Sequence, residues 1–125
     1  MSSSLKPTIQ ALKADGVLAA YIAVKKGSDE NHAIAGSANT SLVFGISQSA
    51  ATTAEDLIEV AVAGGCKAKL GEGVAKGDPL VSHTDGTLVK PNAANDIIIA
   101  WADQDGSTND VIGVIIGRSM ASAAV

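Results

Sequence analysis

The stretch Leu57–Lys90 reads LIEVAVAGGCKAKLGEGVAKGDPLVSHTDGTLVK and carries the strongest indication of the fold class. Its first residues alternate, so that Ile58, Val60 and Val62 fall on one face of an extended chain. The other face carries Glu59 and alanines, and we expect it to meet solvent or a partner. This period of two is typical of a β-strand with one buried face.

Turn residues divide the same stretch into short apolar runs. Asp85-Gly86 tolerates positive φ and predicts a tight hairpin, and Gly64-Gly65 predicts a second turn between two β runs. The glycine-rich segment Gly71–Pro79 predicts a loop that swings the chain from one strand to the next. Short strands separated by such turns are typical of an all-β domain.

The same pattern continues outward in both directions from residue 17 onward. The last two apolar runs are hydrophobic on both faces, which fits strands covered on both sides by a closed barrel or by a neighbouring subunit. We therefore predict a small antiparallel β-barrel or sandwich. The expected strands are Leu18–Lys25, His32–Ala35, Leu42–Ser47, Leu57–Ala63, Cys66–Leu70, Leu80–Ser82, Thr87–Lys90, Ile97–Ala102 and Val111–Ile116.

A weak internal repeat relates two parts of the chain. Residues Leu42–Gly64 and Ile97–Gly117 share an order of apolar strand, polar turn, Asp and second apolar strand. Asp56 in the first segment matches Asp110 in the second, and the valines and isoleucines that follow match as well. The pattern predicts two hairpins related by pseudo-symmetry, and because it occurs only twice it excludes a solenoid.

Length and composition limit the function. A chain of 125 residues fits one domain, and 46% hydrophobic residues with 18% charged residues exclude a disordered coil. One Tyr, one Phe and one Trp argue against a site built on aromatic stacking, and a net charge of −4 argues against a nucleic-acid partner. Cys66 has no partner for an internal disulfide and reads as a small buried strand residue.

The N-terminal segment, residues 1–16, is polar at its start and holds isolated apolar residues. It predicts an extended arm, in which Thr8–Ala14 fits either a short helical turn or a docked extended segment. The apolar run Gly16–Val24 is too short to span a bilayer and lacks a cleavage site, so no membrane association is expected. The predicted organisation is an arm (1–16), a β domain (17–118) and a C-terminal tail (119–125).

No residue pattern predicts an active site. Ser47 lies in FGISQ, which lacks the second glycine of a nucleophile elbow. His83 and Asp85 are interpreted as solvated residues of a polar turn. The glycines after Leu70 lack the Gly-Lys-Ser/Thr ending of a phosphate-binding loop. The carboxylates of Asp103, Asp105 and Asp110 do not have calcium-loop spacing. The two histidines are 51 positions apart, so no metal or cofactor is predicted.

One string suggests another class of protein. Gly73–Leu80 reads GVAKGDPL and is similar to a turn of biotinyl and lipoyl carrier domains, which are small all-β folds. Those domains carry a modifiable lysine in a Met-Lys-Met or Asp-Lys-Ala context, and this chain has neither. Lys90 precedes Pro91 in an unlike context. A carrier domain is therefore kept as the alternative function.

Four pieces of the chain follow one another in a regular order of turns and strands: AYIAVKKGSDENHAIAG (20–36), VFGIS (43–47), the segment from SAATTAEDLIEV through SHTDGTLVK (49–90) and IIAWADQDGSTNDVIGVII (98–116). Through this order, over residues 21–118, the chain resembles the capsid cement, or decoration, proteins of tailed bacteriophages. Ala100-Trp101-Ala102 departs from the resemblance, because the family more often has Gly-Ile-Ala there.

The resemblance implies a non-enzymatic protein on the outer face of a phage head, made in the host cytoplasm, that binds the major capsid protein. It also implies self-association, with a homotrimer favoured over a dimer. Apolar edge strands, if unpaired, would favour self-association as well. The residues expected to contact the capsid or a neighbouring subunit lie in the arm and the tail: Leu5, Ile9, Leu12, Met120 and Val125.

Overall fold

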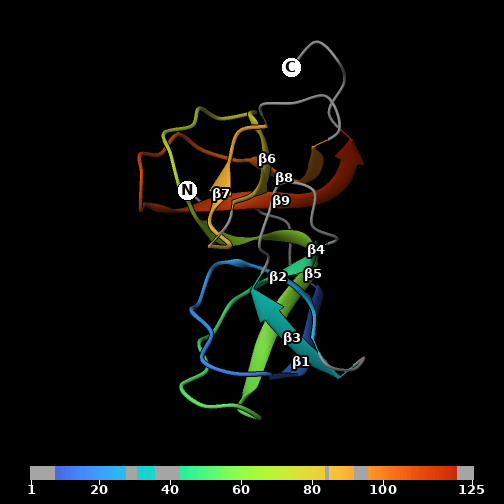
Figure 1. Cartoon of the computed structure of the whole chain (residues 1–125). Coiled ribbons are helices and arrows are strands. Elements are labelled where there is room, and N and C mark those ends of the chain that lie inside the picture. The colour runs from blue at the N-terminus through green and yellow to red at the C-terminus, as the bar shows by residue number, and fades with distance from the viewer. Residues whose placement is uncertain (1–7, 28–30, 36–42, 84, 92–95, 121–125) are drawn as a thin grey trace.

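The computed structural model describes residues 8–27, 31–35, 43–83, 85–91 and 96–120, and these contain strands and no helix (Figure 1). The predicted all-β class is confirmed. The strands are β1 (Thr8–Ala14), β2 (Ala23–Lys26), β3 (His32–Ala35), β4 (Val43–Ser47), β5 (Leu57–Lys69), β6 (Pro79–Ser82), β7 (Leu88–Val89), β8 (Ile97–Ala102) and β9 (Val111–Met120).

Five strand segments close into a first barrel, which we name the N-barrel. Its strands follow the order β1-β3-β2-β4-β5, and β1 also pairs with β5, which closes the ring. The β1–β5 pairing is antiparallel and joins Leu12 to Ile58, whereas β1 and β3 run parallel with Ala14 beside Ala33. The barrel alternative of the prediction is confirmed for this half.

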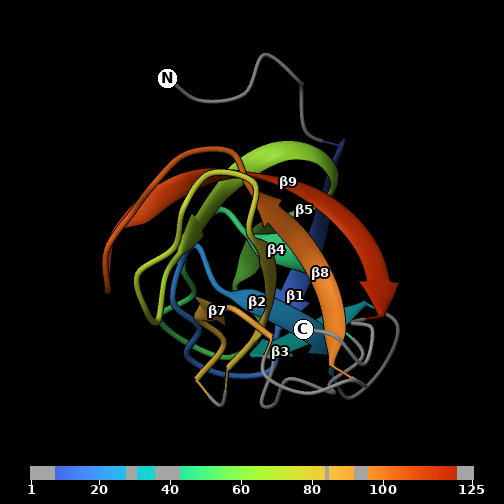
Figure 2. The same ribbon diagram turned by 90° about the horizontal axis from the view of Figure 1, so that it is seen from above.

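The remaining strands form a second ring, the C-barrel, in the order β5-β9-β8-β6-β7. Its seam is a parallel bridge between Leu70, just after β5, and Leu88 of β7, where the Gly71 amide donates to the Leu88 carbonyl at 2.8 Å. In Figure 1 the C-barrel is the upper lobe and the N-barrel the lower one, and Figure 2 shows strands of the upper lobe curving around a common centre.

Strand β5 passes through both barrels. Its residues 57–63 pair with β1 and β4, and its residues 64–69 pair with β9. The predicted turn at Gly64-Gly65 is therefore wrong, because the chain continues as one strand there. Gly64 has a φ of 82°, so the glycines allow a local change of direction between the two rings without ending the strand.

The internal repeat extends over the whole of both barrels. Each pairing of the N-barrel recurs in the C-barrel about 55 residues further along the chain. Thus Leu12 pairs with Ile58 as Ala68 pairs with Ile112. The parallel contact between Ala14 and Ala33 likewise recurs as the contact between Leu70 and Leu88. The second half of β5, together with Leu70 after it, therefore takes the place in the C-barrel that β1 takes in the N-barrel.

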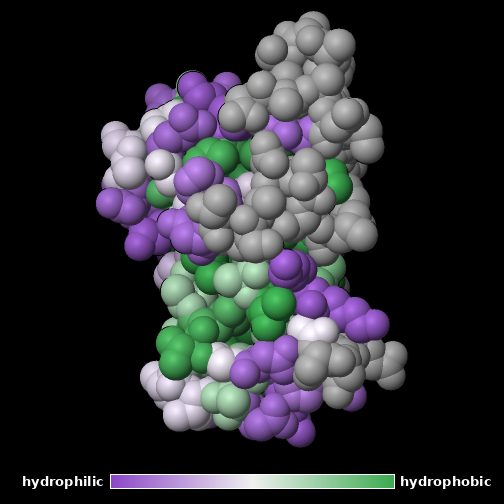
Figure 3. Space-filling model, viewed as in Figure 1, coloured by the Kyte–Doolittle hydropathy of each residue, from purple (hydrophilic) through white to green (hydrophobic). Residues whose placement is uncertain are grey.

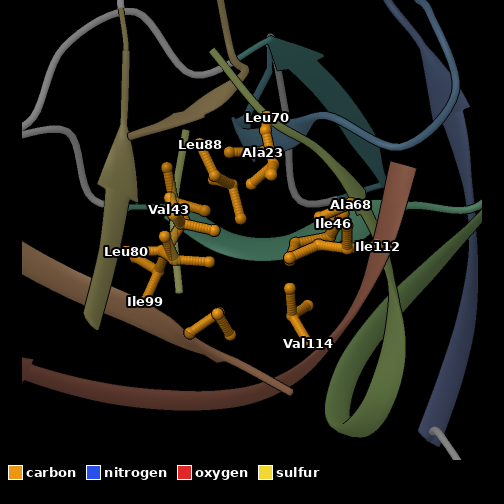
Figure 4. Packing of buried hydrophobic residues seen from close by; sticks show 13 residues of the cluster. Ala23, Val43, Ile46, Ala68, Leu70, Leu80, Leu88, Ile99, Ile112 and Val114 are labelled. Atoms are coloured by element: carbon orange, nitrogen blue, oxygen red, sulfur yellow. The ribbon is translucent and has the colours of Figure 1, made fainter. Parts of the chain in front are cut away.

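Each barrel has its own apolar core, and the two cores use equivalent positions. Ile58 and Val60 are buried in the N-barrel, and their counterparts Ile112 and Val114 are buried in the C-barrel. Figure 4 shows the C-barrel side chains converging from several strands. Strand β4 contributes to both cores, since Val43 and Ile46 join the C-barrel cluster while Phe44 packs against the N-barrel cluster. The barrels thus touch through packed side chains as well as through β5.

Two predicted turns form as the sequence indicates. The hairpin between β6 and β7 turns at Asp85-Gly86, where Gly86 has a φ of 86° and the His83 amide donates to the Thr87 carbonyl at 2.8 Å. In the loop before β6, Gly77 has a φ of 92°. The turn chemistry is local, so it could be predicted without knowledge of the strand partners.

The N-terminal segment differs from the expectation. Thr8–Ala14 forms β1 and pairs with β3 and β5, so the docked extended alternative is confirmed for this stretch and the helical turn is wrong. The stretch is part of the N-barrel and not of a separate arm, and residues 1–7 lie outside the described residues. The predicted strand Leu18–Lys25 is shorter and starts at Ala23, because Tyr21 has a φ of 66°, which a regular strand does not accommodate.

Every strand in the described part of the chain has a neighbour along both edges, through a ladder or a single bridge. The expectation of self-association through unpaired apolar edges therefore loses its basis. Any self-association must use side-chain surfaces instead.

Candidate functional site

The two barrels present the same kind of surface at equivalent positions. Leu57 at the start of the β5 ladder is 69% exposed, and its counterpart Val111 at the start of β9 is 42% exposed. Each stands opposite a lysine, Lys13 across from Leu57 and Lys69 across from Val111. We name these the lysine–aliphatic pairs. An exposed aliphatic side chain beside a lysine stem offers a small apolar contact with one positive charge.

Further apolar surface lies elsewhere in the N-barrel. Ile9 is 42% exposed and Val17 is 80% exposed. Figure 3 shows apolar surface gathered over the lower lobe, which is the N-barrel. In the C-barrel, Trp101 is 38% exposed on β8 and lies across from Ile115. An exposed aromatic side chain such as Trp101 is a common anchor of protein contacts.

A cavity of about 210 Å³ lies where the barrels meet. Its lining comes from β4, β5, β8 and β9 and is apolar: Val43, Phe44, Gly45, Ile46, Val62, Ile99, Ile116 and Gly117. No titratable side chain lines it among the described residues. The cavity has the character of a packing gap between two cores rather than that of a reaction site.

The candidate contact residues fall into three groups. Ile9 is on β1 with an exposed side chain, as a contact residue requires. Leu12 is corrected to a core residue, because it is 5% exposed and packs inside the N-barrel. Leu5 and Val125 lie outside the described residues, as does the side chain of Met120, whose backbone ends β9.

The residues weighed for catalysis have structural partners. The Ser47 hydroxyl is fully buried and donates to the Ala19 carbonyl at 2.8 Å, so it holds the loop before β2. Asp85 accepts from the Thr87 hydroxyl at 2.6 Å, and this hydrogen bond lowers the pKa of the Asp85 carboxyl. His83 is exposed at the hairpin. These contacts match the turn interpretation given to His83 and Asp85.

The carboxylates that follow β8 serve turns. Asp105 accepts from the Lys76 amide at 2.8 Å, and Asp110 accepts from the Ser107 amide at 2.9 Å. Lys76 lies exposed in the turn that resembles carrier domains. The carrier alternative stays a prediction, and an intact mass free of any adduct, measured after expression beside a carrier ligase, would remove it.

Cys66 lies on β5 beside the C-barrel core. Burial raises the pKa of its thiol to about 12, because the thiolate would lose its hydration. The thiol is therefore protonated at neutral pH and a poor nucleophile. This agrees with its interpretation as a strand residue.

The structure brings together one group of potential metal-ligand side chains that the sequence analysis did not identify. Asp15, His32 and Glu55 each bring one ligand atom within 4.8 Å of the others, and among the described residues they form the one such group of three. They are 17 and 23 positions apart in the chain and match no local motif. The pairing of β1 with β3 brings His32 to Asp15, and the pairing of β1 with β5 brings Glu55 to both, so no local sequence pattern could have found the group.

Membrane crossing by a helix finds no support, since the described residues contain no helix that is long and apolar enough.

A solved structure that resembles this chain is that of the head fiber gp8.5 N base in bacteriophage phi29, with a TM-score of 0.71 and 15% sequence identity. The likeness covers 94% of this chain and 99% of that chain, so it includes both barrels. At this identity it establishes a shared fold. Neither a protein-family model nor a curated protein matches the chain.

Proposed function

We propose that the protein is a structural component of a tailed-phage head, bound to the outside of the capsid, where it stabilises contacts between major capsid protein subunits. The observation that carries the proposal is the fold shared with a phage head fiber base over nearly the full length of both chains. The likeness spans the tandem barrels together, which is a more particular arrangement than one small barrel. The sequence resemblance to capsid cement proteins supports the same role.

The exposed surface suits such a role. The lysine–aliphatic pairs repeat at equivalent places on two linked barrels, so one chain offers two similar contacts at a fixed separation. Linked weak contacts reinforce each other when both can be engaged at once. A capsid surface repeats its own features, so a ligand with repeated contacts fits it well.

The proposed activity is non-enzymatic, and the proposed location is the virion. A homotrimer is the favoured assembly state and a dimer the second choice, both on the sequence resemblance. Light scattering of the purified protein distinguishes them, with a mass near three times 12.4 kDa expected for the trimer.

Co-sedimentation with phage heads that lack the protein tests the proposal. Purified protein should sediment with the heads and saturate, and failure to bind at micromolar concentration would show the proposal to be wrong. Because truncating one anchor typically costs about 1–2 kcal/mol, the double variant Leu57→Ser/Val111→Ser should bind at least tenfold more weakly.

A matched control separates these contacts from general loss of apolar surface. Val17→Ser removes an even more exposed aliphatic side chain from the N-barrel, and the counterpart of Val17 in the C-barrel is Gly73, so Val17 belongs to no repeated pair. This variant should bind as the unmodified protein does. If Val17→Ser weakens binding as much as the double variant does, the lysine–aliphatic pairs are not the contact.

A further inference from the structure

Asp15, His32 and Glu55 meet at the seam of the N-barrel. The His32 Nε2 atom lies 2.5 Å from Glu55 Oε2 and 3.9 Å from Asp15 Oδ1. The His32 and Asp15 side chains are 12% and 24% exposed, while Glu55 is 60% exposed, so the group is open to solvent from one side. Lys13 Nζ stands 4.0 Å from Glu55 Oε1 at its rim.

Backbone hydrogen bonds fix the segments that carry these side chains. The Glu55 amide donates to the Ala14 carbonyl at 2.7 Å, and the Asp15 amide donates to the Ala33 carbonyl at 3.2 Å. Asp15 follows β1, His32 begins β3 and Glu55 precedes β5. The three ligand-type atoms are therefore held by the barrel framework rather than by one flexible loop.

The C-barrel serves as an internal comparison. Its equivalent backbone bonds are all present, with the Asn109 amide donating to the Leu70 carbonyl at 2.9 Å and the Gly71 amide donating to the Leu88 carbonyl at 2.8 Å. The side chains there differ, because Gly71, Thr87 and Asn109 occupy the places of Asp15, His32 and Glu55. The fold thus forms without the three ligand-type residues, so their presence in the N-barrel is not a requirement of the barrel.

Two further features of the backbone keep these three side chains together. Glu55 has a φ of 71°, close to the 72° of its counterpart Asn109, and this left-handed region suits Asn better than Glu. Gly27 leaves room for the Asp15 carboxylate, since a Cβ at that position would collide with it. The unusual backbone conformation of Glu55 and the space left by Gly27 for Asp15 thus both allow the two carboxylates to face His32.

We propose that Asp15, His32 and Glu55 bind a divalent transition-metal ion, with Zn²⁺ the best fit. One imidazole and two carboxylates are ligands that Zn²⁺ accepts, and a water would complete four-coordination. Ligand bonds of about 2.0 Å at tetrahedral angles place ligand atoms about 3.3 Å apart. The observed separations of 2.5 Å and 3.9 Å lie on either side of that value, so small side-chain rotations suffice.

The position of the site gives it a structural role. In the C-barrel the strand equivalent to β1 is the covalent continuation of β5, so the chain itself ties it in place. Strand β1 closes the N-barrel, and its parallel pairing with β3 has two register positions, at Lys13 and Ala14. A metal ion shared by β1, β3 and the turn before β5 would lock the closing strand of the N-barrel.

Titration calorimetry on the full chain, first freed of metal with EDTA, tests the proposal with ZnCl₂ at pH 7.5. We expect one Zn²⁺ per chain and a rise in the melting temperature, because an ion that binds only the folded state stabilises it. His32→Gln and Glu55→Asn should each weaken Zn²⁺ binding at least tenfold. Glu55→Asn installs the residue of the equivalent C-barrel position, so this variant should fold.

The second histidine provides the matched control. His83→Gln removes an exposed imidazole in the hairpin and should bind Zn²⁺ as the unmodified chain does. The proposal is overturned if Zn²⁺ neither binds nor raises the melting temperature, if both His32→Gln and Glu55→Asn keep full affinity, or if His83→Gln abolishes binding. Stabilisation by Mg²⁺ equal to that by Zn²⁺ would also overturn it. These readouts need no capsid, so they succeed or fail independently of the proposed function.

Discussion

Residues at equivalent positions of the two barrels share a backbone conformation even where the residue type differs. Tyr21 and Gly77 occupy equivalent places and both have positive φ, at 66° and 92°. Glycine adopts this conformation freely, whereas tyrosine does so only when its surroundings hold it there. A glycine can therefore be recognised as a turn residue from sequence, and a tyrosine in the same role cannot.

Cys66 gives a prediction about alkaline stability. Burial raises the pKa of its thiol to about 12 in the folded chain, well above the ordinary value of a cysteine. The folded state therefore holds the proton more tightly, and stability is complete below pH 9 and falls as the pH rises toward 12. The slope from this group is at most about 1.4 kcal/mol per pH unit.

Urea unfolding at pH 8, 9.5 and 10.5 measures the effect against Cys66→Ala. Cys66→Ala leaves every other side chain in place, so the difference in unfolding free energy between the two proteins isolates the thiol. We expect that difference to shrink as the pH rises. A difference that stays constant across the three pH values would contradict the prediction.

At the level of elements, β5 is the unusual one, because a single strand belongs to two rings. The sequence places Gly64-Gly65 in its middle, and glycine pairs more often mark turns than strand interiors. Residues 57–63 pair with β1 and residues 64–69 pair with β9, so the chain stays extended through the glycines and forms one strand. The glycines act as the joint between the barrels.

Substitution at this joint should be costly. Gly64→Ala places a Cβ on a residue with a φ of 82°, which should destabilise the fold by about 1–2 kcal/mol. The measurement is the unfolding free energy from urea titration. Gly16→Ala is the control, since it has open space around it and no positive φ, and it should change stability by less than about 0.5 kcal/mol. Equal effects of the two variants would argue against a strained joint.

For the whole molecule, the shared strand predicts that both barrels unfold together. Ile58 is 1% exposed in the N-barrel core, and its counterpart Ile112 is 2% exposed in the C-barrel core. Ile58→Ala and Ile112→Ala should each lower stability by about 2–5 kcal/mol. Both should shift one common transition, because loss of β5 from either ring opens the other.

The single Trp allows a direct check. Trp101 fluorescence reports on the C-barrel, whereas far-UV circular dichroism reports on all strands. In Ile58→Ala, both signals should change at the same urea midpoint, below that of the unmodified chain. Early loss of circular dichroism with an unshifted Trp101 transition would show that the barrels unfold separately.

The sequence by itself determined the all-β class, most strand positions, the Asp85-Gly86 hairpin and the repeat that relates Asp56 to Asp110. These features depend on alternation and on turn residues, which act between near neighbours in the chain. Only the tertiary structure decided how the strands close. It made Thr8–Ala14 a barrel strand instead of an arm and joined two predicted strands into β5.

The same distinction holds for the candidate sites. The turn roles of Asp78 and Asp110 could be interpreted from local sequence, because each accepts from an amide three positions away. The meeting of Asp15, His32 and Glu55, and the matching exposure of Leu57 and Val111, follow from strand pairing across tens of residues. Pairing of that kind is fixed by the burial of complete cores, which no local pattern contains.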